Sequence, residues 1–211
     1  MTPLAQLRMH GVLPVVVADD RDCAVSLGDA LVAGGLPLAE VTLRTPAALD
    51  VIRVLAQRTG VLVGAGTVLT ANQVDAAVDA GAAFVVSPGL SRAVVDRCFE
   101  RGVLPIPGAV TATEVQAALE LGLDTVKFFP AESVGGTAAI AALAAPFVGM
   151  SFVPTGGINT SNLDSYLALA CVIAVGGSWM VPRDLVSAQD VASLVYLIAG
   201  AVAEVNKSRP G

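Results

Sequence analysis

The chain has 211 residues, of which 55% are hydrophobic and only 4% aromatic, so it can bury a large aliphatic core. Its formal net charge of −6 and its lack of a basic tract argue against a nucleic-acid partner. The widely spaced Cys23, Cys98 and Cys171 and the single histidine, His10, predict neither a disulfide framework nor a metal site.

Nothing in the sequence predicts export or a membrane span. Residues 1–10 lack the apolar stretch of a signal peptide, and unpaired cysteines fit a reducing compartment, so we expect a cytoplasmic protein. Residues 165–182 are uncharged and mostly apolar, near the length of a membrane helix. However, Gly176-Gly177-Ser178 interrupts them, and 166–170 followed by 172–175 is more typical of a helix and a strand.

Short β-branched apolar runs alternate with helical stretches along the whole chain. We expect a short N-terminal helix at about residues 3–10 and a polar C-terminal tail over 206–211. The eight expected strands are 12–17, 38–42, 61–64, 83–86, 104–106, 125–128, 152–154 and 172–175.

The expected helices carry recognisable start signals. Thr45-Pro46 supplies a cap and a proline at the first helical position, Thr111 to Glu114 forms a capping-box pattern, and Thr160 or Ser161 is a candidate cap. The expected helical segments are 22–33, 46–58, 70–80, 91–101, one opened by Thr111 and ended by Gly122, one after Thr160 or Ser161, and 187–203.

This alternation predicts a parallel sheet covered by helices. Eight units of about 20–25 residues fit a compact (β/α)8 TIM barrel that forms a single domain over residues 1–211. The alternative is a doubly wound open sheet, which usually has a glycine-rich turn after its first strand. Val17-Ala18-Asp19-Asp20 is not such a turn, so the barrel is favoured.

Lys127 stands out because the chain has only two lysines and the other, Lys207, lies in the polar tail. Lys127 lies within 124–130, a short apolar run typical of a buried strand. A lone ammonium group is costly to remove from water unless it is paired or loses its proton. Lys127 is therefore either part of a structural ion pair or a desolvated amine able to form a Schiff base with a carbonyl compound.

Other polar residues lie at or after strand ends, where chemistry gathers in such barrels. Glu40 is either the ion-pair partner of Lys127 or Arg44, or a general acid and base. Arg44 is either a two-pronged ligand for a substrate carboxylate or a solvated charge. Thr67 and Thr155 offer hydroxyl groups, but threonine is also common at strand ends and helix caps.

Two glycine pairs follow the seventh and eighth expected strands. They are Gly156-Gly157 and Gly176-Gly177, and Ser178 follows the second pair. Loops at these positions, together with a helix N-terminus, commonly bind phosphate in (β/α)8 barrels. Backbone N–H groups and the Ser178 hydroxyl could bind such an anion, whereas the alternative is a pair of tight turns.

In these residues the chain resembles the class I 2-keto-3-deoxy-6-phosphogluconate (KDPG) aldolases, many of which also cleave 4-hydroxy-2-oxoglutarate (KHG). The resemblance covers nearly the whole chain, and its strength lies in the order of the motifs. The motifs are Gly34-Gly35, 40–45 (EVTLRT), 64–69 (GAGTVL), 87–89 (SPG), Pro107-Gly108, 127–132 (KFFPAE), 154–158 (PTGGI) and 176–179 (GGSW).

The resemblance implies a homotrimeric barrel that needs no metal and no cofactor. It implies that Lys127 is the Schiff-base lysine and that Glu40 is the acid and base. The residues that it implies around the substrate are Arg44, Thr67 and Thr155 for the pyruvate part, Pro88 and Phe129 for the pocket wall, and Gly156, Gly157, Gly177 and Ser178 for the distal phosphate.

The reaction implied by the resemblance is reversible cleavage of KDPG to pyruvate and glyceraldehyde 3-phosphate. Some similar aldolases carry a basic residue after the first strand, where this chain has Asp19-Asp20. Cleavage of KHG or a related 2-keto-3-deoxy acid therefore stays open, as do a non-catalytic barrel that binds phosphorylated metabolites and a phosphate-binding isomerase or synthase. The expected partners are small keto acids and aldehydes.

Overall fold

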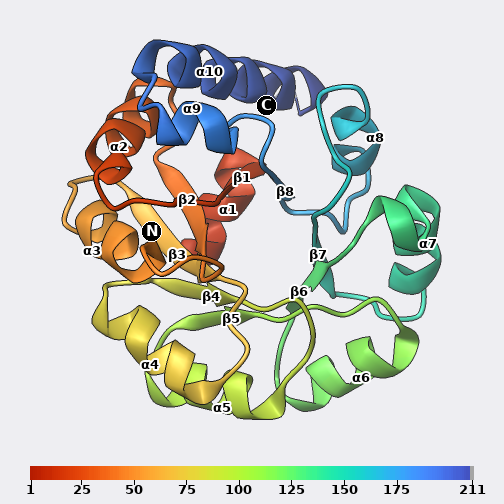
Figure 1. Cartoon of the computed structure of the whole chain (residues 1–211). Coiled ribbons are helices and arrows are strands. Elements are labelled where there is room, and N and C mark those ends of the chain that lie inside the picture. The colour runs from red at the N-terminus through yellow and green to blue at the C-terminus, as the bar shows by residue number, and fades with distance from the viewer. Residues whose placement is uncertain (210–211) are drawn as a thin grey trace.

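The computed structural model describes residues 1–209, and within them strands and helices alternate (Figure 1). The strands are β1 (Val12–Val16), β2 (Leu38–Thr42), β3 (Leu62–Gly66), β4 (Phe84–Val86), β5 (Leu104–Ile106), β6 (Thr125–Phe128), β7 (Ser151–Pro154) and β8 (Val175–Gly177). The helices are α1 (Pro3–His10), α2 (Cys23–Ala33), α3 (Ala48–Ala56), α4 (Ala71–Asp79), α5 (Arg92–Glu100), α6 (Ala112–Glu120), the 3-10 helix η1 (Glu132–Val134), α7 (Gly136–Ala144), α8 (Leu163–Leu167), α9 (Arg183–Ser187) and α10 (Val191–Ser208).

The strands form a curled six-stranded sheet, in the order β5-β4-β3-β2-β1-β8, and a two-stranded sheet of β6 and β7. Every strand pair is parallel. Isolated bridges also join Lys127 to Gly108 and Phe152 to Val172. In Figure 1 most helices lie on the outer side of the strands, whereas α1 lies across one end of them. The expected α/β architecture, with parallel strands covered by helices, is therefore confirmed.

The strands are buried on both faces, as their continuous apolar sequences predicted. All residues of β1 and β2 are buried. The few aromatic rings fill specific gaps: Phe128 and Phe152 meet edge to face at 6.4 Å. Phe84 lies against Gly64, where a Cβ atom would come within 2.3 Å of the ring. Glycine is therefore required at this position of β3, because the Phe84 ring occupies the space of a side chain. The strand ends at Gly66, two residues beyond the predicted end at residue 64.

Two helices begin with complete capping boxes. Thr111 accepts a hydrogen bond from the Glu114 N–H while the Glu114 carboxylate accepts one from the Thr111 N–H, as predicted. Thr70 and Gln73 do the same at the start of α4. Each such cap typically contributes about 1 kcal/mol to helix stability.

Two other predicted caps are wrong. The Thr45 hydroxyl donates to the Ala18 carbonyl at 2.5 Å instead of capping a helix, and α3 begins only at Ala48. Thr160 and Ser161 lie in a turn in which the Asn159 carboxamide oxygen accepts from both the N–H and the hydroxyl of Ser161. Helix α8 follows that turn, with no side-chain cap. In both cases the polar side chain makes a tertiary or turn hydrogen bond instead of capping the helix N-terminus.

The eighth strand lies later than predicted. The apolar run 172–175 contributes only Val175 to β8, whereas Gly176 and Gly177 pair with Leu13 and Pro14 of β1. The glycines were expected in a loop after the strand, and that expectation is wrong. A Cβ atom on Gly176 would lie 2.3 Å from Thr155 Oγ1, and one on Gly177 would lie 1.8 Å from the Trp179 ring. Glycine fits this strand because its neighbours leave no room for a side chain.

The C-terminal helices also differ from the prediction. The expected helix 187–203 is replaced by α9 and α10, because Gln189 adopts a left-handed backbone (φ 56°) and Asp190 caps a new helix. Helix α10 continues to Ser208, so residues 206–208 of the expected polar tail 206–211 are helical, and residues 210–211 lie outside the described residues. The sequence analysis assigned no helix to the α7 segment.

Within residues 1–209, α10 is the one helix long and apolar enough to cross a membrane, judged by length and composition alone. Its side chains Leu194, Ile198 and Ala201 are buried, and the helix packs against α2 and α8. The uncharged stretch 165–182 is not a single helix, because it contains the end of α8 and all of β8. Helix α10 is thus a packed surface helix of this fold.

Candidate active site

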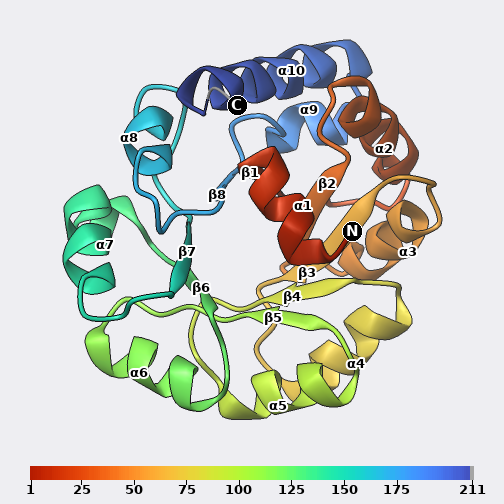
Figure 2. The same cartoon turned by 180° about the vertical axis from the view of Figure 1, so that it is seen from behind.

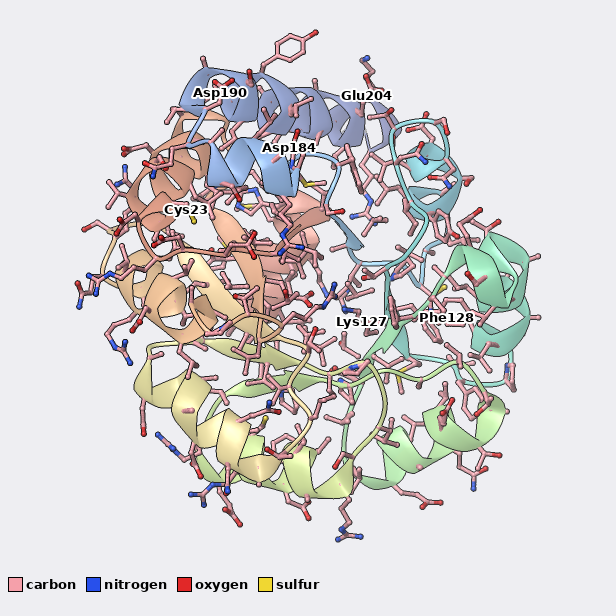
Figure 3. All side chains as sticks on the ribbon, in the orientation of Figure 1. Cys23, Lys127, Phe128, Asp184, Asp190 and Glu204 are labelled. Carbon is pink, nitrogen blue, oxygen red and sulfur yellow. The ribbon has the colours of Figure 1, made fainter. Side chains whose placement is uncertain are left out.

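The buried pair of Lys127 and Glu40 is the centre of the candidate site. Lys127 Nζ lies 3.3 Å from Glu40 Oε1, and the two side chains are 6% and 1% exposed. Figure 3 places Lys127 among the strands, near the middle of the molecule. The two residues are 87 positions apart in the sequence, and they meet because the Glu40 side chain on β2 and the Lys127 side chain on β6 point toward each other. The ion pair considered from the sequence is therefore present, and the same geometry allows a proton to pass between the two groups.

Gly66, the last residue of β3, makes room for the Glu40 carboxylate. A Cβ atom at this position would lie 2.2 Å from Glu40 Oε1 and 2.7 Å from its carboxyl carbon. Only glycine fits beside this buried acid without a displacement. Gly66 belongs to the motif at 64–69, but no role for it could be predicted, because a linear sequence does not show which side chain faces a glycine.

Phe129 flanks the lysine on its other side. The Lys127 Nζ atom lies 5.3 Å from the centre of the Phe129 ring, within the range of a cation–π interaction. A positive charge on an iminium formed at this nitrogen would therefore face the ring. The predicted pocket residue Phe129 is thus placed directly beside the predicted nucleophile.

Arg44 and Thr67 follow the ends of β2 and β3 and meet side by side. Arg44 Nε donates to Thr67 Oγ1 at 3.1 Å. Thr67 holds this position with a left-handed backbone (φ 57°), which is uncommon for a β-branched residue and costs on the order of 1–3 kcal/mol. Within the described residues Arg44 has no carboxylate partner, so its charge is available to an anionic ligand.

A cavity of about 220 Å³ opens at this end of the strands. Seven of the residues predicted around the substrate line it, together with Val15, Val17 and Ile158. Those seven are Arg44, Phe129, Thr155, Gly156, Gly157, Gly177 and Ser178. Lys127 lies behind this wall, next to Phe129. Segments after β2, β6, β7 and β8 therefore converge on one cavity, as the parallel strand order requires.

Thr155 lines this cavity and carries a buried polar atom without a partner. Its Oγ1 atom is buried and has no hydrogen-bond partner among residues 1–209. An unpaired buried hydroxyl costs about 1–3 kcal/mol, and such a group needs an explanation in a folded protein. This hydroxyl lies beside Gly176, on which a Cβ atom would come within 2.3 Å of Oγ1.

The Gly156-Gly157 turn is held from behind by η1. The Ala131 N–H donates to the Thr155 carbonyl at 2.8 Å, and the Glu132 N–H donates to the Gly156 carbonyl at 3.1 Å. Both glycines have positive φ angles of 105° and 80°. These bonds fix the turn so that it presents backbone rather than side chains to the cavity.

Glu132 and Tyr166 are supporting residues to which sequence reasoning gave no role. The buried Tyr166 hydroxyl donates to the Glu132 carboxylate, and burial followed by this hydrogen bond raises the pKa of Tyr166. The Glu132 side chain fills the space beside Gly157, where a Cβ atom would come within 2.7 Å of Glu132 Cγ. The available signal was the position of Glu132 in the motif that begins with Lys127.

Pro88 lies in the loop after β4 and is not among the residues that line the cavity. Its carbonyl oxygen would lie 2.0 Å from a Cβ atom on Gly108, so the loops after β4 and β5 are in close contact there. The structure therefore gives Pro88 a place in loop packing, next to the segment that bridges to Lys127.

The acidic segment after β1 is neutralised within the chain. Arg183, at the start of α9, binds Asp19 through two hydrogen bonds of 2.7 and 2.5 Å. These bonds hold the pKa of the Asp19 carboxyl below its usual value. The pair ties the β1 loop to the segment after β8, and Asp19 adds little uncompensated negative charge near the cavity.

The thiols and acids elsewhere form no second reactive cluster in the described part of the chain. No group of three or more His, Cys, Asp or Glu side chains within residues 1–209 is arranged to hold a metal ion. Burial raises the pKa of Cys98 to about 12 and that of Cys23 to about 11, which disfavours the thiolate form of both.

Comparison with known proteins places this geometry in a family. The family model for KDPG and KHG aldolase matches residues 4–197. A 2-dehydro-3-deoxy-phosphogluconate aldolase from Treponema pallidum is 49% identical over 187 residues, which cover 88% of this chain and 89% of that protein.

Solved structures of KDPG aldolases are also similar to this chain. A KDPG aldolase from Zymomonas mobilis with 3-phosphoglycerate is 42% identical, covers 94% of both chains and gives a TM-score of 0.89. A Legionella pneumophila KDPG aldolase with pyruvate captured as a covalent carbinolamine is 37% identical, with coverage of 95% and 98% and a TM-score of 0.91. The chain described here therefore belongs to the KDPG and KHG aldolase family.

Proposed function

We propose that this protein is a lysine Schiff-base aldolase that reversibly cleaves KDPG to pyruvate and glyceraldehyde 3-phosphate. The observation that carries the proposal is the buried contact of 3.3 Å between Lys127 and Glu40 beside a cavity with an unpaired arginine. Membership of an aldolase family and the pyruvate carbinolamine in the Legionella relative support the same chemistry.

The reaction begins at Lys127. In its neutral form, the Lys127 amine attacks the C2 carbonyl carbon of the keto acid and forms a carbinolamine. Glu40, within proton-transfer reach, donates the proton with which the carbinolamine hydroxyl leaves as water, and an iminium ion results. The positive nitrogen is then the electron sink for cleavage. Phe129, with its ring face toward this nitrogen, stabilises the positive charge.

Cleavage follows from the same two residues. The Glu40 carboxylate removes the proton of the C4 hydroxyl, and the C3–C4 bond breaks. Its electron pair forms a C2–C3 double bond while the C=N π pair moves to the nitrogen, so that an enamine results. Glyceraldehyde 3-phosphate leaves. Protonation of the enamine carbon and addition of water to the iminium then release pyruvate and regenerate the Lys127 amine. Reversal of these steps joins the two products.

The cavity residues divide between the two ends of the substrate. Arg44 and Thr67 are proposed to bind the keto-acid carboxylate, because the guanidinium has no carboxylate partner among the described residues and already contacts the Thr67 hydroxyl. Thr155 is proposed to use its unpaired hydroxyl near the pyruvate part. Phe129 and Pro88 are proposed as pocket residues.

The distal phosphate is proposed to bind at the glycine-rich wall. The residues involved are Gly156, Gly157, Gly177 and Ser178, all of which line the cavity. Backbone N–H groups can approach an anion closely there because the two glycine pairs carry no side chains. These four residues are neutral, and Arg44 is the one charged residue among those that line the cavity in the described part of the chain.

We also propose that residues 1–211 form one (β/α)8 domain in which the two sheets close into a barrel. The bridges from Lys127 to Gly108, Phe152 to Val172 and Thr155 to Gly176 lie at the junctions between the sheets and support closure. The proposed assembly is a homotrimer, and the proposed location is the cytoplasm. The proposed reaction requires no metal and no cofactor. Light scattering after size-exclusion chromatography tests the subunit number, and turnover after exhaustive chelation tests the metal independence.

Trapping with borohydride tests the proposed chemistry. Pyruvate and sodium borohydride should add a mass equal to a reduced pyruvate adduct at Lys127, and turnover should stop. Lys127→Ala should prevent the adduct, whereas Lys207→Ala, which removes the other lysine, should leave it unchanged. No adduct, or one that survives Lys127→Ala, would reject the Schiff-base mechanism and favour a non-catalytic binding barrel.

Cleavage of KHG is the second candidate activity. The acidic Asp19-Asp20 segment supplies no cation for a phosphate at the end of β1, which favours a shorter dicarboxylate. Comparison of kcat/KM for KDPG and KHG distinguishes the two activities. A preference for KDPG that Ser178→Ala reduces mainly through KM supports the phosphate assignment, whereas an equal or greater kcat/KM for KHG supports the alternative.

A further inference from the structure

A second cavity lies at the opposite end of the strands. Its volume is about 220 Å³, and it is lined by Arg8 and Arg209 together with residues of the segment 167–173. Arg8 NH2 donates to the hydroxyl of Ser151, the first residue of β7. Figure 2 shows α1, which carries Arg8, in front of the strands on this face. The cavity is thus separate from the candidate active site, which lies beyond the other strand ends.

The two arginines have no carboxylate partner within residues 1–209, although the chain is acidic overall. Every ion pair among these residues uses other cations. Arg44 in the candidate active site shares this property. Arginines that line a cavity and lack an acid are suited to an anionic ligand, because the planar guanidinium binds carboxylate or phosphate through paired N–H groups.

The charges of the two arginines also act on each other. Burial, and then the charge of Arg8, lowers the pKa of Arg209 from its usual value. Two nearby cations without an acid between them repel, so an anion that contacts both would remove an unfavourable interaction. Within residues 1–209, the Arg209 guanidinium donates to the carbonyls of Ile173, at 3.0 Å, and Val172, at 2.5 Å.

Enough hydrogen-bond donors remain for such an anion. A guanidinium carries five N–H groups. Arg209 uses two of them and Arg8 uses one in bonds within the described residues, which leaves three and four respectively. A water molecule takes up about 30 Å³ of liquid volume, so a cavity of about 220 Å³ has room for a tetrahedral oxyanion and several waters.

We propose that this cavity is a second anion site that binds a phosphate dianion between Arg8 and Arg209. The ligand class is inorganic phosphate or the phosphate group of a small monoester. Its binding ties α1 and the end of α10 to the beginning of β7 and to the segment before β8. This site stands independently of the proposed aldolase chemistry, because it shares no residue with the cavity beside Lys127.

Isothermal titration with inorganic phosphate at pH 7.5 tests the proposal. All proteins carry a C-terminal carboxamide in place of the carboxylate of Gly211, so that a terminal carboxylate cannot serve as the anion. We expect the double variant Arg8→Gln/Arg209→Gln to bind one phosphate fewer per chain, or to lose at least tenfold in affinity at one site. Titration with glycerol 3-phosphate in parallel shows whether a monoester binds more tightly than free phosphate.

Arg21→Gln is the matched control, because Arg21 is an exposed arginine that lies outside this cavity. It should bind as much phosphate as the unaltered chain. If the glutamine variant folds poorly, Arg8→Lys/Arg209→Lys replaces it. This variant keeps both charges, so it should still bind phosphate, but more weakly than the unaltered chain. Equal phosphate stoichiometry and affinity in the unaltered chain and a folded glutamine variant would overturn the proposal, whatever the outcome of pyruvate trapping.

Discussion

Two ionic regions of this molecule differ in what their geometry achieves. On the surface, Arg97 binds Asp75 through two hydrogen bonds of 2.9 and 3.0 Å, and Arg101 contacts the same carboxylate. Inside, Lys127 and Glu40 share one longer contact of 3.3 Å. The surface network joins α4 to α5 with better geometry, yet water screens it, and exposed pairs contribute little stability.

The interior pair has poorer geometry but much greater consequence. Both of its members are nearly removed from water, so each depends on the other for compensation of its charge. A single, longer hydrogen bond also leaves donor and acceptor positions for a substrate. If Lys127 and Glu40 act as proposed, the geometry of an ion pair is a poorer guide to its role than its burial beside a cavity.

Replacement of Lys127 should have the largest effect. Lys127→Ala is expected to reduce kcat by about 10⁴-fold or more, the order observed when a covalent nucleophile is removed. It also leaves the Glu40 carboxylate buried without a partner, which should lower the free energy of unfolding by about 3–5 kcal/mol. Steady-state turnover and urea denaturation measure the two effects. Lys207→Ala, at an exposed pair with Glu204, is the control and should change neither quantity.

Glu40→Gln should separate proton transfer from shape. The amide preserves the size of the side chain and one hydrogen bond, so the protein should fold. Loss of general acid and base catalysis should reduce kcat by about 10²–10⁴-fold. Single-turnover measurements should show slower formation of the pyruvate adduct at Lys127. Unchanged turnover in the folded variant would mean that Glu40 serves only to compensate the lysine charge.

Gly66→Ala should act through Glu40 without touching Lys127 directly. The new methyl group would displace the Glu40 carboxylate, and a misplacement of about 1 Å can reduce turnover by about 10²-fold. Gly200→Ala is the control, because a Cβ atom at that helical position meets nothing within 4 Å. If Gly66→Ala retains full activity while its crystal structure shows a displaced Glu40, the position of this acid is not critical.

The smallest effect is expected from the surface network, and it should appear only in acid. Hydrogen bonds from Arg97 and then Arg101 lower the pKa of Asp75 below the usual value for an aspartate. Its contribution to stability is therefore present above that value and is lost as the pH falls through the lower pKa of the folded state.

Thermal melting between pH 6 and pH 2 measures this effect. Asp75→Asn should slightly lower Tm near neutral pH and weaken the dependence of Tm on pH in the acid range, with kcat at neutral pH unchanged. A fall in kcat as large as that of Glu40→Gln would remove the distinction between the two ionic regions.

Local sequence was sufficient for much of this molecule. Continuous apolar runs predicted seven of the eight strands to within two residues at each end, because strands buried on both faces need apolar residues throughout. The Thr111 capping box was predicted because all of its atoms lie within four residues. Lys127 and Glu40 were also found in advance, since a charged side chain in an apolar run is conspicuous without any structure.

Tertiary structure alone decided the features that depend on distant partners. Thr45 failed as a cap because the Ala18 carbonyl accepts its hydroxyl, and Gly176-Gly177 became a strand because Thr155 and Trp179 occupy the space of side chains. The sequence also did not predict the role of Gly66 or the position of Arg8 and Arg209 around one cavity. Sequence determines which groups are costly to bury, but only the folded chain determines which groups meet, because those contacts join residues far apart along it.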